Sequence, residues 1–159
     1  MNIDIKIPLI ITFLFSVLVT WIVIHFINDY NYEHFTCTAS YSAIKNGNVM
    51  ISKNSLIIHG EKGIWMMDGK ITHADAKSLF FKLRNNFRFE RTMLAYHFYS
   101  DKVAIAPDVL MHSSVLSEFL PDILIKEKQS SFFYIYPINK NYIIFSNSMP
   151  IMYCKKQTA

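Results

Sequence analysis

The chain has 159 residues and a formal net charge of +4 at pH 7; 15% of its residues are aromatic and only 18% are charged. Without a dense run of Lys and Arg, this mild positive charge argues against a nucleic-acid-binding protein. The length allows one domain with a modest core beside a hydrophobic segment. The aromatic content favours strands, so we expect a small β-rich domain.

Residues 7–27, IPLIITFLFSVLVTWIVIHFI, contain no Asp, Glu, Lys or Arg. A helix of this length rises roughly 30 Å, the thickness of the hydrocarbon core of a bilayer. A buried core helix is a weak alternative because the segment is apolar on every side. A cleaved signal peptide is the stronger alternative, but no Ala-x-Ala-like site follows, since the first alanine is Ala39. We therefore predict an uncleaved transmembrane helix.

The charges that flank this helix predict its orientation. Lys6 precedes the helix, whereas Asp29 and Glu33 follow it and no Lys or Arg occurs again before Lys45. Positive charge stays on the cytoplasmic side of a membrane, so the large domain is expected outside. The predicted organisation is a cytoplasmic tail (1–6), the transmembrane helix (7–27), a tether (28–34) and a periplasmic β-rich domain (35–159).

The exported domain begins with residues of alternating polarity, which predict strands. In FTCTASYSAIK (35–45), Phe35 and Cys37 belong to the apolar face. Asn46–Gly47 favours a two-residue hairpin turn. The pattern continues with a second strand at 48–59, a turn at 60–63, and a third strand at 64–72 that is bulged or bent at Asp68–Gly69.

The strongest alternation lies in LFFKLRNNFRFER (79–91). One face carries Leu79, Phe81, Leu83, Phe87 and Phe89, and the other carries Lys82, Arg84, Arg88 and Glu90. This pattern predicts a long strand with a basic outer face. That face is either an ordinary solvated surface or an attachment surface for acidic ligands, anionic lipid heads or a partner.

One helix is expected after two further strand segments, 93–100 and 102–106. Asp108 can cap this helix, Pro121 ends it, and between them an apolar stripe at helical spacing packs on the sheet. The stripe consists of Met111, Val115, Leu116, Phe119 and Leu120. Short strands at 131–138, 142–147 and 150–154 complete an α+β domain: a mainly antiparallel, curved or partly closed sheet with one covering helix.

Cys37 and Cys154 are the only cysteines. A cysteine pair in an exported domain commonly forms a disulfide, and this bond would close almost the whole domain into one loop. On the chain-entropy model, a loop of ~100 residues is stabilised by up to ~4–5 kcal/mol. The alternatives are two separate buried thiols or a metal pair, although no Cys or His cluster has zinc-ligand spacing.

No catalytic or cofactor motif occurs: the sequence lacks G-x-S-x-G, P-loop, G-x-G-x-x-G and H-E-x-x-H patterns. His34 and Cys37 are three residues apart, which on a strand places them on opposite faces, so they are not expected to share a metal. We therefore predict a non-catalytic protein without a cofactor or metal.

Several motifs in order along the chain carry a family resemblance. They are the single N-terminal span, HFTCTA around Cys37, FLPDIL with Leu120–Pro121, YIIFSNSMP with Pro150, and the YC pair at Cys154. On these motifs the chain resembles the FidL-like inner-membrane proteins of enterobacteria, a group that includes YqeJ-like proteins. The resemblance covers nearly the whole chain and is weakest over residues 68–91.

The resemblance implies a role beside a transcription regulator. FidL-like proteins are often encoded next to ToxR-like membrane-bound regulators, in the manner of ToxS-like and VtrC-like companions whose periplasmic β-rich domain pairs with that of the regulator. In the VtrC-like type, the paired domains form a barrel that holds a bile salt. The first functional hypothesis is therefore a single-span accessory protein in the bilayer that binds and stabilises a ToxR-like regulator.

The second hypothesis is a module that binds an amphipathic small molecule, such as a bile salt or a lipid-like molecule, in an aromatic-lined cavity. The candidate lining residues, for most of which core packing is the alternative, are Phe81, Phe87, Phe89, Tyr96, Phe98, Phe132 and Tyr134. A cavity of several hundred Å³ would favour this hypothesis. A filled core with an open strand edge would favour the first.

Overall fold

The computed structural model describes residues 6–73, 77–108, 110 and 115–157. The strands are β1 (His34–Lys45), β2 (Asn48–His59), β3 (Lys62–Thr72), β4 (Ser78–Thr92), β5 (Ala95–Ala106), β6 (Ser130–Ile138), β7 (Asn141–Ser146) and β8 (Met149–Lys156). The helices are α1 (Lys6–Glu33), the 3-10 helix η2 (Leu116–Glu118) and α2 (Asp122–Ile125).

Helix α1 is long and apolar enough to cross a membrane, which is consistent with a membrane anchor or a signal segment. It continues to Glu33, so most of the expected tether at residues 28–34 is helical rather than irregular. The helix with its flanking residues and the remainder of the chain from Phe35 onward are two separate compact units. The boundary between them falls between His34 and Phe35.

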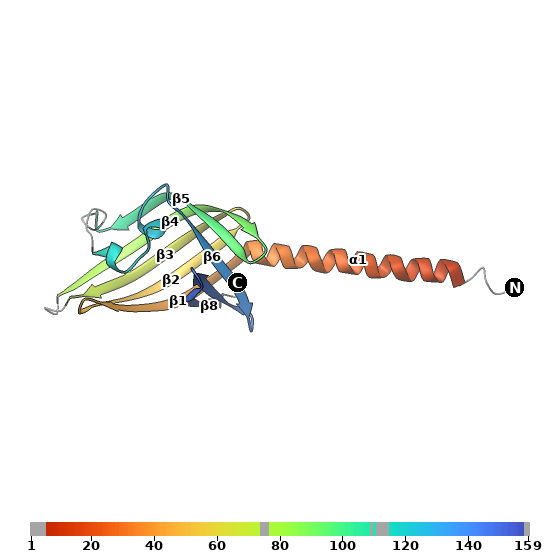
Figure 1. Ribbon diagram of the computed structural model, residues 1–159, viewed down its shortest axis with the longest axis horizontal. Coiled ribbons are helices and arrows are strands. Elements are labelled where there is room, and N and C mark those ends of the chain that lie inside the picture. The colour runs from red at the N-terminus through yellow and green to blue at the C-terminus, as the bar shows by residue number, and fades with distance from the viewer. Residues whose placement is uncertain (1–5, 74–76, 109, 111–114, 158–159) are drawn as a thin grey trace. The chain divides into compact units, whose positions relative to one another are not determined.

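The second unit is a closed barrel of eight strands in sequence order (Figure 1). This confirms the predicted antiparallel, curved sheet and adds that the sheet closes on itself. Tight two-residue turns make the meander possible. Both residues have positive φ at Asn46–Gly47, Asn139–Lys140 and Asn147–Ser148, the conformation that hairpin turns favour.

The strands differ in length, and the barrel therefore has two unlike ends. In Figure 1, the long strands β1–β5 extend beyond β6 and β8. We call the part where all eight strands run together the closed end. The part built from β1–β5 alone is the open end, because β6 accompanies β5 only over Ala95–Tyr99 and β8 accompanies β1 only at Cys37 and Thr38.

Aromatic side chains fill the closed end. Phe98 stacks on Phe87 with ring centroids 4.2 Å apart and lies 5.0 Å from Phe133, while Phe35 stacks on Tyr142 at 4.1 Å. The disulfide between Cys37 and Cys154, which the sequence predicted, is present at this end. It joins two residues that are 117 positions apart in the sequence. A pairing of this kind is typical of a domain outside the cytoplasm.

The interior of the open end is covered by residues 115–125, which belong to the connection between β5 and β6. Leu116, Phe119 and Leu120 are buried in the core, which confirms the packing predicted for the apolar stripe. The expected helix from Asp108 to Pro121 is wrong in its placement. Asp108 and Leu110 lie in a 3-10 turn, Leu116–Glu118 forms η2, and Pro121 precedes α2 instead of ending a helix. Proline is well tolerated there, because the first backbone N–H groups of a helix have no partner within it. Met111, also assigned to the stripe, lies outside the described residues.

Strand β3 is regular, and the bulge or bend expected at Asp68–Gly69 is absent, since these residues pair directly with Lys82 and Phe81. Gly69 instead allows a close approach of β2: a Cβ there would lie 2.6 Å from the Ile51 carbonyl oxygen and 2.7 Å from Ser52 Cβ. Gly63, expected in a turn, likewise lies in β3 against Phe87. The irregularity in this part of the sheet lies between β4 and β5, at Asn86/Phe87.

Candidate functional site: a free strand edge and a basic groove

The aromatic residues predicted to line a cavity are divided between the two faces of the sheet. Five of them are buried inside the barrel, where they pack against other core residues: Phe81, Phe87, Phe89, Tyr96 and Phe98. Phe132 and Tyr134 point outward and are 52% and 38% exposed, whereas their neighbour Phe133 is buried. The aromatic-lined cavity proposed from the sequence is therefore a filled core, and two of its members are surface residues.

The basic residues predicted for the outer face of β4 do lie there and are exposed. Lys82 Nζ lies 3.4 Å from a carboxylate oxygen of Asp68. The Arg88 guanidinium bonds Asp101, with Nε and Oδ2 2.9 Å apart, and this hydrogen bond raises the pKa of Arg88 above its usual value. Arg84 donates to the Asn86 side chain and not to a carboxylate. Lys82, Arg84 and Arg88 thus meet different partners, and only Lys82 and Arg84 border the hollow described below.

Strand β1 has an edge that β8 leaves open. Only Cys37 and Thr38 pair with β8, although β1 continues to Lys45. The carbonyl of Thr36 points toward β8, where it accepts a bond from the Gln157 N–H. Because alternate residues of a strand direct their backbone groups to the same edge, those of Ser40, Ser42 and Ile44 point there as well.

These three residues carry the unpaired edge. On their side of β1, no backbone bond from Ser40, Ser42 or Ile44 is present among the described residues. The Ile44 side chain is 77% exposed. Tyr41 and Ala43 alternate with them and lie partly buried against the core. The edge is therefore a short stretch of strand with a half-covered apolar side and an open outer side.

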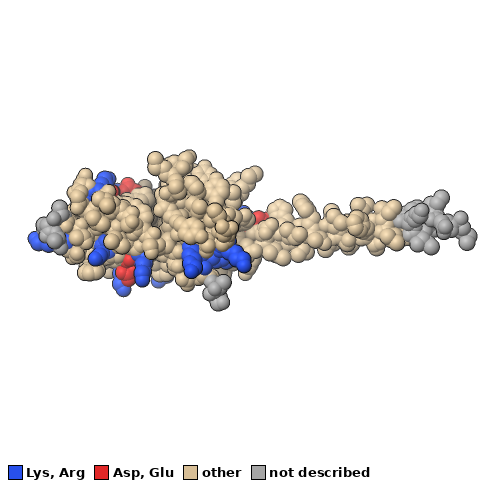
Figure 2. Space-filling model, turned by 90° about the horizontal axis from the view of Figure 1, so that it is seen from below, with Lys and Arg blue, Asp and Glu red and all other residues tan. Residues whose placement is uncertain are grey.

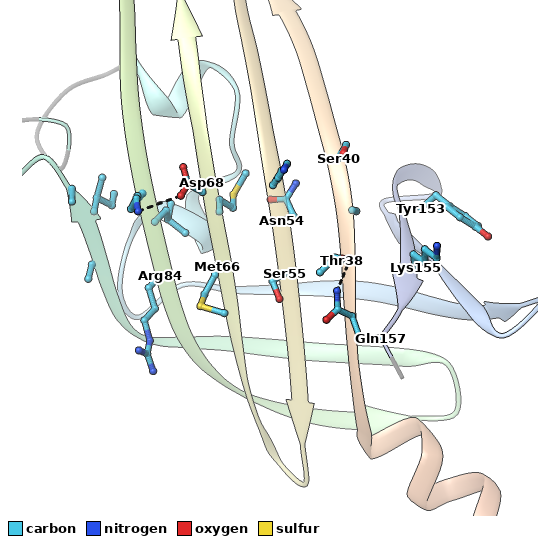
Figure 3. A pocket seen from close by; sticks show the side chains of 18 of the residues that line it. Thr38, Ser40, Asn54, Ser55, Met66, Asp68, Arg84, Tyr153, Lys155 and Gln157 are labelled. Atoms are coloured by element: carbon cyan, nitrogen blue, oxygen red, sulfur yellow. Dashed lines mark hydrogen bonds and ion pairs between the residues drawn. The ribbon is translucent and has the colours of Figure 1, made fainter. Parts of the chain in front are cut away.

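A hollow of about 1130 Å³ lies on the outer face beside this edge (Figure 3). Two rows of outward-facing side chains cross its floor: Lys53, Asp68, Lys82 and Ala106 in one row, and Ser55, Met66, Arg84 and Ala104 in the other. Thr38 and Ser40 border it on β1. Tyr153 and Lys155 project from β8 on one side, and Arg84 lies on the opposite side. We call this hollow the outer groove.

Positive charge predominates in the outer groove. Four cationic side chains and two carboxylates line it: Lys53, Lys82, Arg84 and Lys155, with Asp68 and Asp108. Lys82 is already paired with Asp68, whereas neither Lys53 nor Lys155 has an ion-pair partner within the described part of the chain. In Figure 2 the visible face of the barrel likewise carries several Lys and Arg side chains and few Asp or Glu.

A further polar cluster lies on the outer face of the closed end. Tyr99 OH and His97 Nδ1 are 2.6 Å apart, and the His97 ring stacks on Phe132 at 4.1 Å. Burial raises the pKa of the Tyr99 hydroxyl, and Glu90 acts in the same direction. No group of three or more His, Cys, Asp or Glu side chains that could hold a metal occurs among the residues that the structure describes.

An open strand edge was expected from the sequence, but neither its position nor the outer groove could be predicted. The free edge depends on how far β8 follows β1, which alternation within one strand does not indicate. Lys53 and Lys155 belong to strands far apart in sequence from Lys82, and neither lies in a charge run that would mark it. The alternation of β2 indicates that Lys53 faces outward, but many other solvent-facing residues show the same alternation, so it does not mark a site.

Comparisons of the chain with protein-family models, with curated proteins and with solved structures find no significant match.

Proposed function

We propose that this protein is a non-catalytic, single-span inner-membrane protein whose periplasmic barrel binds and stabilises a partner protein. The observation that carries the proposal is the unpaired edge of β1 at Ser40, Ser42 and Ile44. Exposed strand edges pair readily with another strand, and a free edge left in a native sheet is a common recognition element. The orientation places the N-terminus in the cytoplasm, as the charges around α1 favour.

The edge also specifies what kind of strand can be added. One side of the added strand would extend the apolar contacts of Tyr41 and Ala43, which are only partly covered. The other side would face solvent beside Ser42 and Ile44. An added strand should therefore alternate apolar and polar residues over about five or six positions, a common strand length.

On the FidL-like resemblance, the proposed partner is the periplasmic domain of a ToxR-like membrane-bound regulator. A companion that binds only the folded regulator stabilises it by mass action, which protects the regulator from proteolysis. The outcome in cells is measurable. Deletion of the protein should shorten the half-life of the neighbouring regulator after translation is blocked. An unchanged half-life together with unchanged target-gene expression would refute this choice of partner.

A matched pair of proline variants tests the edge itself. The N–H of Ser42 points away from β2, so Ser42→Pro removes a donor that only an added strand would use, and proline is tolerated at such positions. The N–H of Ala43 points to β2, so Ala43→Pro removes a bond within the barrel and should destabilise it. We expect Ser42→Pro to keep the melting temperature of the full chain while abolishing co-purification of the regulator from membranes. Normal recovery of the regulator with Ser42→Pro would exclude strand addition.

The proposed topology has its own test. Alkaline phosphatase fused after residue 159 should be active, because the enzyme forms its own disulfides only outside the cytoplasm. A fluorescent protein that matures only in the cytoplasm should remain dark at the same position. The opposite pair of results would reverse the orientation.

Binding of an amphipathic small molecule, such as a bile salt or a lipid-like molecule, is the alternative function. The observation in its favour is a set of buried oxygen atoms without hydrogen-bond partners at the open end: Ser52 Oγ, Asn54 Oδ1 and Glu118 Oε2. Buried polar atoms usually have partners, so a bound molecule beneath residues 115–125 would supply them. A rise in melting temperature of the full chain with taurocholate, absent in Asn54→Leu, would support this function. No shift with taurocholate or a lysophospholipid would oppose it.

A further inference from the structure

We infer that the outer groove receives an acidic segment of the partner, continuous with the strand that adds to the edge of β1. This inference rests on the proposed strand addition and extends it by naming the chemistry of the partner's neighbouring residues. The edge and the groove are contiguous because Ser40 belongs to both: it is the first edge residue of β1 without a β8 partner, and it borders the groove.

The path of the added chain follows from where β8 pairs with β1. A strand that adds at Ile44 and Ser42 reaches Ser40 and then meets β8, which already occupies the edge at Thr38. The chain must leave the plane of the sheet at this point. The inner side is closed, since Cys37 is fully buried and Ala39 is part of the filled core. The outer side opens into the groove, between Tyr153 of β8 and the floor of the sheet.

The positive charge of the groove favours acidic residues in the part of the partner chain that leaves the sheet and enters the groove. Lys53 lies on the strand next to β1, and Lys155 projects from the wall that β8 forms; neither has an ion-pair partner among the described residues. A segment that carries Asp or Glu would pair with both, and opposite charges brought together at an interface fix its register and speed association. Met66 on β3 offers an apolar contact on the groove floor, on the side of β2 away from β8.

The length of the acidic segment can also be bounded. Neighbouring strands lie about 4.8 Å apart, so the line from the edge of β1 across β2 and β3 to β4 spans roughly 14 Å. An extended chain advances about 3.3 Å per residue, and roughly four or five residues would cover that distance. We therefore expect the carboxylates within about five residues of the end of the added strand.

Site-specific photo-crosslinking in living cells tests the inference on the full-length protein. p-Benzoylphenylalanine is placed at Ser42 on the edge, at Ser55 on the groove floor, or, as the control, at Lys140 in the turn between β6 and β7, outside the groove lining. The crosslinked peptides are then sequenced by mass spectrometry. We expect Ser42 and Ser55 to capture two adjoining segments of the same partner. The segment captured from Ser55 should be rich in Asp and Glu, and Lys140 should capture neither.

The possible outcomes separate the inference from the proposed function. If Ser42 captures a partner strand but Ser55 captures a neutral or basic segment, or none, the inference is wrong and strand addition stands. If Ser42 captures no strand, the proposed function and the inference both fail. A lipid or small molecule captured at Ser55 would also overturn the inference, because it assigns the groove to a different occupant.

Charge reversal provides an independent measurement. The double variant Lys53→Glu with Lys155→Glu should weaken partner binding at least tenfold at 50 mM NaCl and flatten the dependence of binding on salt. The reason is that repulsion between like charges would replace attraction between opposite ones. The control, Lys62→Glu with Lys140→Glu, changes the net charge equally at exposed positions outside the groove and should bind as the unaltered protein does. Equal weakening in both double variants would show a general charge effect and overturn the inference. Melting temperatures of both variants verify that the barrel remains folded.

Discussion

The closed and open ends of the barrel differ in how they bury the inner face of the sheet. The closed end joins all eight strands around stacked aromatic rings and is linked by the Cys37–Cys154 bond. The open end has five strands, polar residues such as Asn54 and Asn85 in its interior, and a cover formed by the segment around α2. The disulfide and the stacked rings are thus concentrated at the closed end, whereas the edge proposed for recognition lies at the open end.

The cover is attached by specific polar contacts and by apolar packing. Asn85 donates from Nδ2 to the carbonyl of Ile123 and accepts from Ser100 Oγ at 3.2 Å. Lys45 Nζ reaches the carbonyl of Glu118 at 3.0 Å, which joins the cover to the end of β1. The cover is therefore in contact with β1 just beyond the free edge, at Lys45.

Removing the disulfide should have the largest effect on stability and should act mainly on the closed end. For the double variant Cys37→Ala with Cys154→Ala, the chain-entropy model predicts a loss of up to about 4–5 kcal/mol. Denaturant unfolding of the full chain in detergent micelles measures this loss. Hydrogen exchange should rise most in β1 and β8. An unchanged midpoint, or free alkylation of both thiols in unreduced protein, would contradict the prediction.

A smaller effect is expected when a methyl group is added where the closed end has no room for it. The Cβ of Gly63→Ala would overlap the Phe87 ring, which is stacked on Phe98, and would lie 2.8 Å from the Ile57 carbonyl oxygen. Overpacking of this kind costs up to about 3 kcal/mol. Thermal unfolding measures it, and Phe87→Leu should recover part of the loss in the double variant. A loss that Phe87→Leu leaves unchanged would assign the strain to the backbone contact.

The smallest of the three effects is expected at the open end. Asn85→Ala leaves the Ile123 carbonyl without its donor, which costs roughly 1–2 kcal/mol. Its neighbour Asn86 faces outward to Arg84, so Asn86→Ala is a matched control that should change little. Hydrogen exchange should rise over residues 116–125 in Asn85→Ala and remain unchanged in β7 and β8. Equal loosening of both ends would show that the barrel responds as one unit, against the division proposed here.

Much of the fold was predictable because the barrel repeats one simple pattern. The alternation in residues 35–45 and 79–91 correctly assigned which side chains are buried, including Cys37 and Phe81. Once the domain was expected outside the cytoplasm, two cysteines left few pairings to consider. Asn46–Gly47 predicted its hairpin because both residues adopt positive φ readily.

Two errors have identifiable causes. In SFFYIYPI, apolar or aromatic residues occupy both alternating sets of positions. Alternation therefore could not decide between Phe132 and Phe133, and the outward residue was selected. The stripe before Pro121 has helical spacing, but the cover needs only to place apolar side chains over the open end, which η2 and short turns achieve. The site was less predictable still, because groove and edge arise from strand lengths and from registers across the barrel.

The disulfide also determines how tension passes through the molecule. β1 begins at His34, directly after α1, and reaches the covalent link three residues later at Cys37. A pull between α1 and the proposed partner strand at Ser42 would run along the backbone of β1, which is bonded covalently to the last strand of the barrel. Only two residues of β1 pair with β8, and hydrogen bonds alone would allow strands with so short a pairing to separate. The disulfide holds β8 on β1 at Cys37, so the proposed addition of a strand at Ser42 would leave the closed end shut.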